Sequence, residues 1–81
     1  MRRTRMEIRL DILKLCCIPR RVTQIVYQCN LNFKIYKTHL GYLIERGWIK
    51  RINNLYKTTD EGEGILDYVS PAISLLAEYP V

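Results

Sequence analysis

The fold is decided by one stretch, KTHLGYLIERGWIK, at residues 37–50. Its pattern predicts the later part of an amphipathic helix that ends at Gly47 and leads directly into a strand. Leu40 and Leu43 mark the apolar face of this helix. The opposite face is polar and contains Gly41, which costs about 1 kcal/mol relative to alanine inside a helix. This polar face therefore needs a role beyond folding.

Two further helices are predicted before this stretch. Apolar residues recur at helical spacing over residues 4–17, and Thr4 with Glu7 three positions later forms a capping box. A short helix is expected over residues 22–29, and the third helix over 32–46, beginning at an asparagine suited to capping. We take Leu40 as the centre of the buried side of the third helix. At 100° per residue, the positions that lie within about 60° of Leu40 around the helix axis are expected to face inward: Phe33, Tyr36, Leu43, Ile44 and Gly47.

A small hairpin and a last helical segment are predicted after Gly47. Residues 48–52 alternate like a strand, Asn53-Asn54 suits a two-residue turn, and residues 55–58 pair back. A fourth helix opens at residue 59 and is restarted or kinked at Pro71. Three helices followed by a hairpin is the order of a winged helix-turn-helix, mostly α with a small β-hairpin. We expect a single domain with a body at 1–58 and a C-terminal helical segment at 59–81.

Charge is distributed unevenly along the 81 residues. All 13 Lys and Arg residues lie in residues 1–57 together with three acids, a net charge of +10, whereas residues 58–81 carry five acids and no base, a net −5. Such an asymmetry indicates which partners a protein attracts rather than which fold it adopts. The basic part favours a polyanion.

Other classes of function find little support in the composition. Cys16, Cys17 and Cys29 lack the spacing of a disulfide framework or a zinc site and are expected to be small hydrophobes, while His39 is expected to be half-buried and hydrogen-bonded. Charged residues follow the basic N-terminus, so no signal peptide or membrane span is predicted. We expect no enzyme, no metal, no cofactor and no small-molecule substrate, and a cytoplasmic location.

One segment, NLNFKIYKTHLGYLIERGWI at residues 30–49, resembles the core of the small archaeal winged helix-turn-helix proteins, which are predicted transcriptional regulators and related DNA-binding proteins. The resemblance extends over residues 6–69. It implies double-stranded DNA as a partner and a homodimer formed through the helix after the wing. The residues that carry it are Thr23, Ile25, Val26, Tyr27, Asn30, Leu31, Asn32, Phe33, His39, Leu40, Leu43, Gly47, Ile49, Thr59, Gly62 and Leu66.

The candidate DNA-binding residues fall on three parts of the chain. The third helix, about 32–46, would enter the major groove with a polar face made of Lys34, Lys37, Thr38, Gly41 and Tyr42. Gly41 has two interpretations, a close approach to DNA or a close helix contact inside the protein.

The other two parts would meet phosphates or the neighbouring groove. Before the second helix, Arg20 and Arg21 are expected to meet a phosphate. Three polar residues at the starts of the second and third helices are expected to cap these helices, with a phosphate contact as the second interpretation: Thr23, Gln24 and Asn32. The wing, about 48–58, would reach the adjacent groove or remain a solvated hairpin, through Arg51, Asn53, Asn54 and Lys57.

A dimer contact is expected from the apolar stripe Leu66, Val69, Ile73 and Leu76, which a monomer would leave exposed. The sequence leaves three functions open: a sequence-specific transcriptional regulator, a low-specificity architectural DNA-binding protein, and a protein-interaction module. The charge asymmetry favours the first two.

Overall fold

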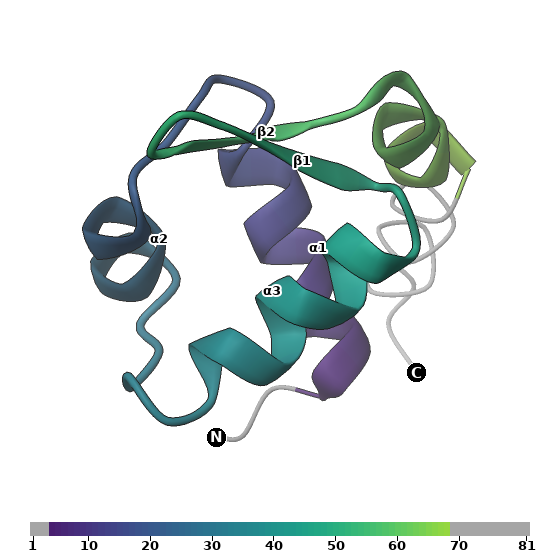
Figure 1. Ribbon diagram of the computed structural model, residues 1–81. Helices are drawn as coiled ribbons and strands as arrows, with labels where there is room; N and C mark the ends of the chain where they lie inside the picture. The colour runs from purple at the N-terminus through teal and green to yellow at the C-terminus, as the bar shows by residue number, and fades with distance from the viewer. Residues whose placement is uncertain (1–3, 69–81) are drawn as a thin grey trace, which may run out of the picture.

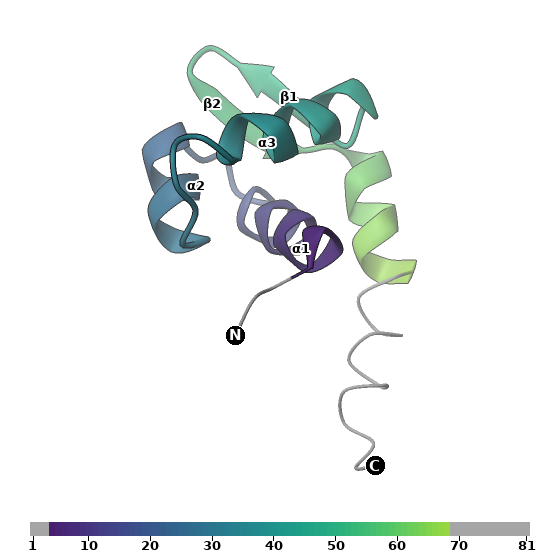
Figure 2. The same cartoon turned by 90° about the horizontal axis from the view of Figure 1, so that it is seen from below.

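Residues 4–68 are described by the structure, which is a computed structural model (Figure 1). Its elements, in chain order, are α1 (Arg5–Leu15), α2 (Val22–Gln28), α3 (Tyr36–Glu45), β1 (Ile49–Ile52) and β2 (Leu55–Thr58). Residues 60–68 are also helical. Figure 2 shows α1 beside α3, with α2 and residues 60–68 on either side of this pair. The predicted winged helix-turn-helix order is confirmed.

Helix α1 begins as the sequence predicts. The Thr4 hydroxyl accepts a hydrogen bond from the Glu7 backbone N–H at 3.1 Å, and the Glu7 carboxylate accepts one from the Thr4 N–H at 3.3 Å. The helix ends at Leu15, two residues before the predicted end. The Arg20 Nε donates to the Leu15 carbonyl at 3.1 Å and thus satisfies one of the carbonyls that a helix end leaves without a partner.

Side chains from all three helices and the hairpin form one core. Its fully buried members come from the inward faces of these elements: Ile12, Leu13, Cys16, Ile25, Leu43 and Ile49. Ile65 and Leu66, from the helical residues 60–68, are half-buried against the same core. The described part of the C-terminal segment thus belongs to the same folded unit as the preceding residues.

The hairpin is antiparallel, and Ile49 pairs with Thr58 at its base. Asn53 has a φ of 56°, the left-handed conformation that the first central position of a tight hairpin turn requires, so the predicted Asn53-Asn54 turn is confirmed. The Thr58 hydroxyl is buried and donates to the Leu13 carbonyl at 2.7 Å, and its N–H donates to the Cys16 carbonyl at 2.8 Å. These two bonds fix the wing to the end of α1.

The end of α3 and the start of the last helix are joined through two glycines. Gly47, at φ 78°, donates to the Ile44 carbonyl, and Trp48 donates to the Leu43 carbonyl, which is the Schellman pattern expected of a C-terminal glycine. The Thr59 hydroxyl donates to the Gly47 carbonyl at 2.6 Å and accepts from the Gly62 N–H at 3.2 Å. Thr59 therefore caps the helical residues 60–68.

The start of α3 differs from the prediction. The helix begins at Tyr36, not at Asn32, because residues 33–35 form a turn. The Asn32 Oδ1 accepts hydrogen bonds from the N–H groups of Lys34 and Ile35, each at 2.9 Å. An asparagine side chain offers nearby backbone groups a local partner that competes with helix formation. Asn32 therefore caps the turn before the helix.

The buried side of α3 is rotated relative to the prediction. Phe33 and Ile44, expected inside, are 56% and 39% exposed, and Gly47 is exposed as well. Tyr42, expected outside, is half-buried against the core. The reason is the position of α1, which packs on the side of α3 that carries His39 and thereby moves the centre of burial away from Ile44.

Candidate nucleic-acid interface

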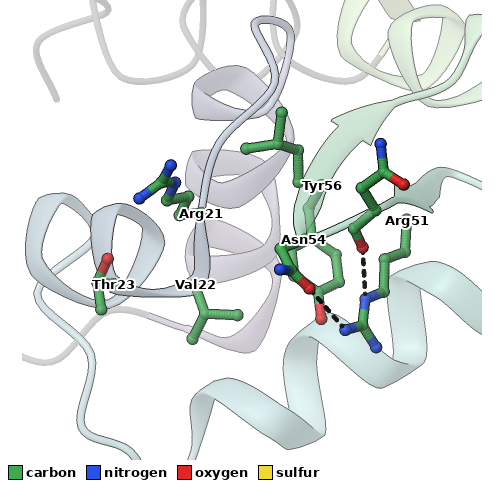
Figure 3. Close-up of a pocket in the computed structure, with 8 residues that line it drawn as sticks. Arg21, Val22, Thr23, Arg51, Asn54 and Tyr56 are labelled. Atoms are coloured by element: carbon green, nitrogen blue, oxygen red, sulfur yellow. Dashed lines mark hydrogen bonds between the residues drawn. The ribbon is translucent and has the colours of Figure 1, made fainter.

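An open groove of about 700 Å³ lies between the start of α2 and the wing (Figure 3). Residues from both elements line it: Arg21, Val22, Thr23, Arg51, Asn53, Asn54, Leu55 and Tyr56. Arg21 and Arg51 stand on opposite sides of the groove. A cation on each wall and polar side chains between them suit a phosphate backbone, since most protein contacts to DNA are made to phosphates and sugars.

Arg51 is held in place by the turn of its own hairpin. Its Nε donates to the Asn53 carbonyl at 3.0 Å, and its Nη2 donates to the Asn54 Oδ1 at 3.3 Å. Figure 3 shows the guanidinium folded back toward Asn54 along these bonds. Its carbon also lies 5.9 Å from the centre of the Tyr56 ring on the opposite strand. The wing therefore presents a cation whose position is set before any ligand arrives.

The start of α2 carries polar residues that the sequence predicted as caps or phosphate contacts. Arg21 is exposed, and the Gln24 Oε1 accepts a hydrogen bond from its backbone N–H at 3.0 Å. Gln24 thus acts as the predicted cap of α2. Thr23 is exposed in the groove.

Arg20 lies elsewhere, contrary to the expectation that both arginines face one phosphate. Its backbone pairs with Tyr56 of β2 through two hydrogen bonds of 3.0 and 2.7 Å, and its half-buried side chain turns toward the end of α1. Consecutive residues of an extended segment point to opposite sides, so only Arg21 reaches the groove. Arg20 has a structural position.

The outward face of α3 is open. Lys37, Thr38 and Gly41 are exposed on the helix, and Lys34 is exposed in the turn before it. A Cβ added at Gly41 would meet no atom within 4 Å. The interpretation that Gly41 permits close packing inside the protein is therefore wrong within the described residues. The other interpretation, a close approach to DNA, stays a prediction.

Tyr42 is not part of this open face. Its ring lies edge-on to Trp48 at 6.0 Å, and the Arg9 guanidinium covers it with its carbon 3.7 Å from the ring centre. Its predicted place on the exposed face is wrong, because the ring is half-buried against the core.

The hairpin register reveals a cation that the sequence reasoning missed. Lys50 is exposed and lies directly opposite Lys57 across the two strands. Like charges in this arrangement repel and destabilise the hairpin, and an anion bound between them would relieve the repulsion. Lys57 also donates to the Thr58 carbonyl at 3.4 Å. Once the turn is placed at Asn53-Asn54, counting outward from it pairs these two lysines, so this signal was available.

His39 is buried, and its Nδ1 accepts a hydrogen bond from the Arg9 Nε at 3.3 Å. Burial lowers the pKa of His39, and the positive charges of Arg9 and Arg5 lower the pKa further. The predicted hydrogen bond of His39 is confirmed, whereas its side chain is buried more deeply than predicted.

The three cysteines behave as small hydrophobic residues. Cys16 and Cys29 are buried and Cys17 is half-buried, all as free thiols. Burial raises the pKa of Cys16 to about 12, so its reactive thiolate is scarce at neutral pH. Within residues 4–68, no group of three His, Cys, Asp or Glu side chains could hold a metal ion.

The predicted dimer stripe is only partly described. Leu66 is half-buried against the protein's own core, which leaves less of it for a partner than expected. Val69, Ile73 and Leu76 lie outside the described residues. In the described part of the chain, no helix has both the length and the apolar character needed to cross a membrane.

Comparison with known proteins agrees with this arrangement. Residues 2–76 match the model of the winged helix-turn-helix family, and the chain belongs to that family. It is also similar to an uncharacterized protein of Methanocaldococcus jannaschii, with 31% identity over 58 residues, which is 72% of this chain and 26% of that relative. The chain thus spans about a quarter of the relative's length. A winged helix-turn-helix domain supports DNA as the partner.

Proposed function

We propose that this protein is a sequence-specific transcriptional regulator that binds double-stranded DNA. Helix α3 enters the major groove, and the wing lies on the adjacent groove or backbone. The observation that carries the proposal is the groove of about 700 Å³ with Arg21 on one wall and Arg51 on the other, together with the exposed side chains of α3. This arrangement allows backbone contacts to position the helix while exposed side chains of α3 reach base edges.

The first test separates backbone contacts from base contacts. Arg21→Ala should weaken binding to all sequences about equally and reduce the slope of log affinity against log salt by about 1, since one phosphate contact is lost. Lys37→Ala and Thr38→Ala should instead reduce the ratio between a selected site and random DNA. Fluorescence anisotropy at several salt concentrations measures both effects. Equal losses on selected and random DNA from the α3 variants would refute base readout.

A second candidate is an architectural DNA-binding protein of low specificity. One observation favours it: the stretch from Phe33 to Glu45 contains no Arg, Asn or Gln, so among the side chains that form the common paired hydrogen bonds with base edges it has only lysines. Selection from fragmented genomic DNA separates the candidates, because a regulator enriches one site whereas an architectural protein enriches none. An absence of binding at low salt would instead favour a protein-interaction module.

We also propose that the protein acts as a homodimer through its C-terminal segment. The proposal is supported by the apolar residues that the sequence places at Val69, Ile73 and Leu76. Dimers of this class bind two half-sites, so the selected DNA should be a palindrome. Sedimentation at tens of micromolar protein tests this, and a monomeric mass would refute it.

A further inference from the structure

The outward face of α3 has few groups that can hydrogen-bond a base. His39 and Tyr42 turn toward α1, where Arg9 contacts both. The polar side chains left exposed on α3 are Lys37, Thr38 and Glu45. Lysine only donates hydrogen bonds and glutamate only accepts them, so neither can pair with both the donor and the acceptor that adenine presents.

On the same face, the missing side chain of Gly41 leaves open space beside Thr38, and we call this part of the surface the Thr38–Gly41 step. Thr38 and Gly41 are three residues apart and are therefore neighbours on the helix surface. Both are exposed, and the space where a Cβ of Gly41 would stand is empty. Thr38 thus stands beside a position where the helix backbone at Gly41 is open to solvent.

An aromatic ring lies in the turn before this step. Phe33 is 56% exposed, and its ring packs edge-on against Tyr36 with 5.8 Å between the ring centres. Contact with Tyr36 orients a ring that nevertheless remains largely in solvent. Recognition helices contact base edges mainly through their N-terminal residues, and Phe33 is next to that end of α3.

We infer that α3 reads the C5-methyl groups of thymine, through the Thr38–Gly41 step and the ring of Phe33, and that the preferred DNA is therefore rich in A·T pairs. This inference rests on the proposed function, since it requires α3 in the major groove. The thymine methyl is the apolar group that the four bases present in that groove, and threonine methyls and phenylalanine contact it. The surface described above is apolar, small and accessible, which suits a methyl group.

The expected difference in affinity between DNA with and without the methyl groups follows from the area that one methyl buries. Burial of one methyl-sized group corresponds to about fourfold in affinity. Two such contacts, one at the step and one at Phe33, give roughly fifteenfold by the same estimate. This effect is independent of salt, unlike the contribution of the phosphate contacts.

The test compares duplexes that differ only in these methyl groups. Affinity is measured for a 20-bp A·T duplex and for the same duplex with deoxyuridine in place of thymidine, and then for a G·C duplex with and without 5-methylcytosine. We expect the methylated member of each pair to bind roughly fifteenfold more tightly. Thr38→Ser, which removes a methyl but keeps the hydroxyl, should reduce this ratio about fourfold. Thr4→Ser, the same change at the exposed residue that caps α1, keeps the capping hydroxyl and should leave the ratio unchanged.

Equal affinity for the thymidine and deoxyuridine duplexes, with binding that is clearly measurable, would overturn methyl readout and leave the proposed DNA binding intact. An unchanged ratio in Thr38→Ser would overturn the role of the Thr38–Gly41 step. No binding to any duplex at low salt would overturn the proposed function together with this inference.

Discussion

Replacement of Gly41 by alanine should stabilise the protein and weaken its binding to DNA. Gly41 lies inside α3, is exposed, and has no atom within 4 Å of the position of a new Cβ, so alanine fits without displacing a neighbour. Alanine favours a helix interior by about 0.8–1 kcal/mol relative to glycine. In a domain of this size, such a gain raises the melting temperature by roughly 4–8 °C. Thermal and urea unfolding followed by circular dichroism measure this part.

DNA binding should change in the opposite direction. If α3 approaches a base edge closely at Gly41, the new methyl group enters space that the DNA occupies. Overpacking of a well-fitted contact costs roughly 1–3 kcal/mol, which corresponds to a loss of affinity of about fivefold to more than a hundredfold. Anisotropy measurements on a selected duplex, at a temperature where both proteins are folded, measure this part.

Gly64→Ala is the matched control. Gly64 is also an exposed helical glycine, with no atom within 4 Å of a new Cβ, but it lies in the helical residues 60–68 and not in α3. Gly64→Ala should stabilise the protein by a similar amount and leave DNA affinity unchanged. Unchanged affinity in Gly41→Ala would refute the close approach of α3 to DNA. Equal losses in both variants would show that the loss comes from a source other than contact at Gly41.

Three further predictions concern folding. Gly62→Ala should destabilise the protein by about 1–3 kcal/mol in urea unfolding, because the new Cβ would collide with the Trp48 carbonyl oxygen. Gly47→Ala should cost about 1–2 kcal/mol in the same assay, since its φ of 78° is unfavourable for a residue with a Cβ. The folded pKa of His39 is lowered, so its contribution to stability is present above the unfolded pKa of 6.5 and is lost as pH falls. His39→Gln should therefore show a smaller loss of stability between pH 7 and pH 5 than the unchanged protein, and equal losses would contradict the assignment.

Much of the fold could be predicted because its decisive signals are local. A threonine three residues before a glutamate specifies the start of α1, and a glycine after an apolar stripe specifies the end of α3. Asn53 adopts the positive φ that the hairpin turn needs. Each of these features depends on residues within one turn of chain, so neighbouring sequence contains the required information.

The errors arose where distant segments meet. The direction from which α1 packs determines which side of α3 is buried, and no property of α3 alone distinguishes Ile44 from Tyr42 as the exposed residue. Arg20 was misplaced for the same reason, since its pairing with Tyr56 joins residues that are far apart in sequence. The groove with Arg21 and Arg51 on its walls likewise exists only after α2 and the wing have been brought together.

The residues that would contact DNA and those that set the geometry of contact are different residues. Lys37, Thr38 and Arg21 are exposed, so their replacement removes a contact without disturbing the core. The position of the wing on the rest of the fold depends instead on the buried Thr58, which bonds to α1, and on Gly62, which lies against the Trp48 carbonyl. Simultaneous contact by helix and wing requires these two parts to be correctly spaced. Changes at Thr58 or Gly62 should therefore affect every DNA sequence alike, whereas changes on α3 should affect the choice among sequences.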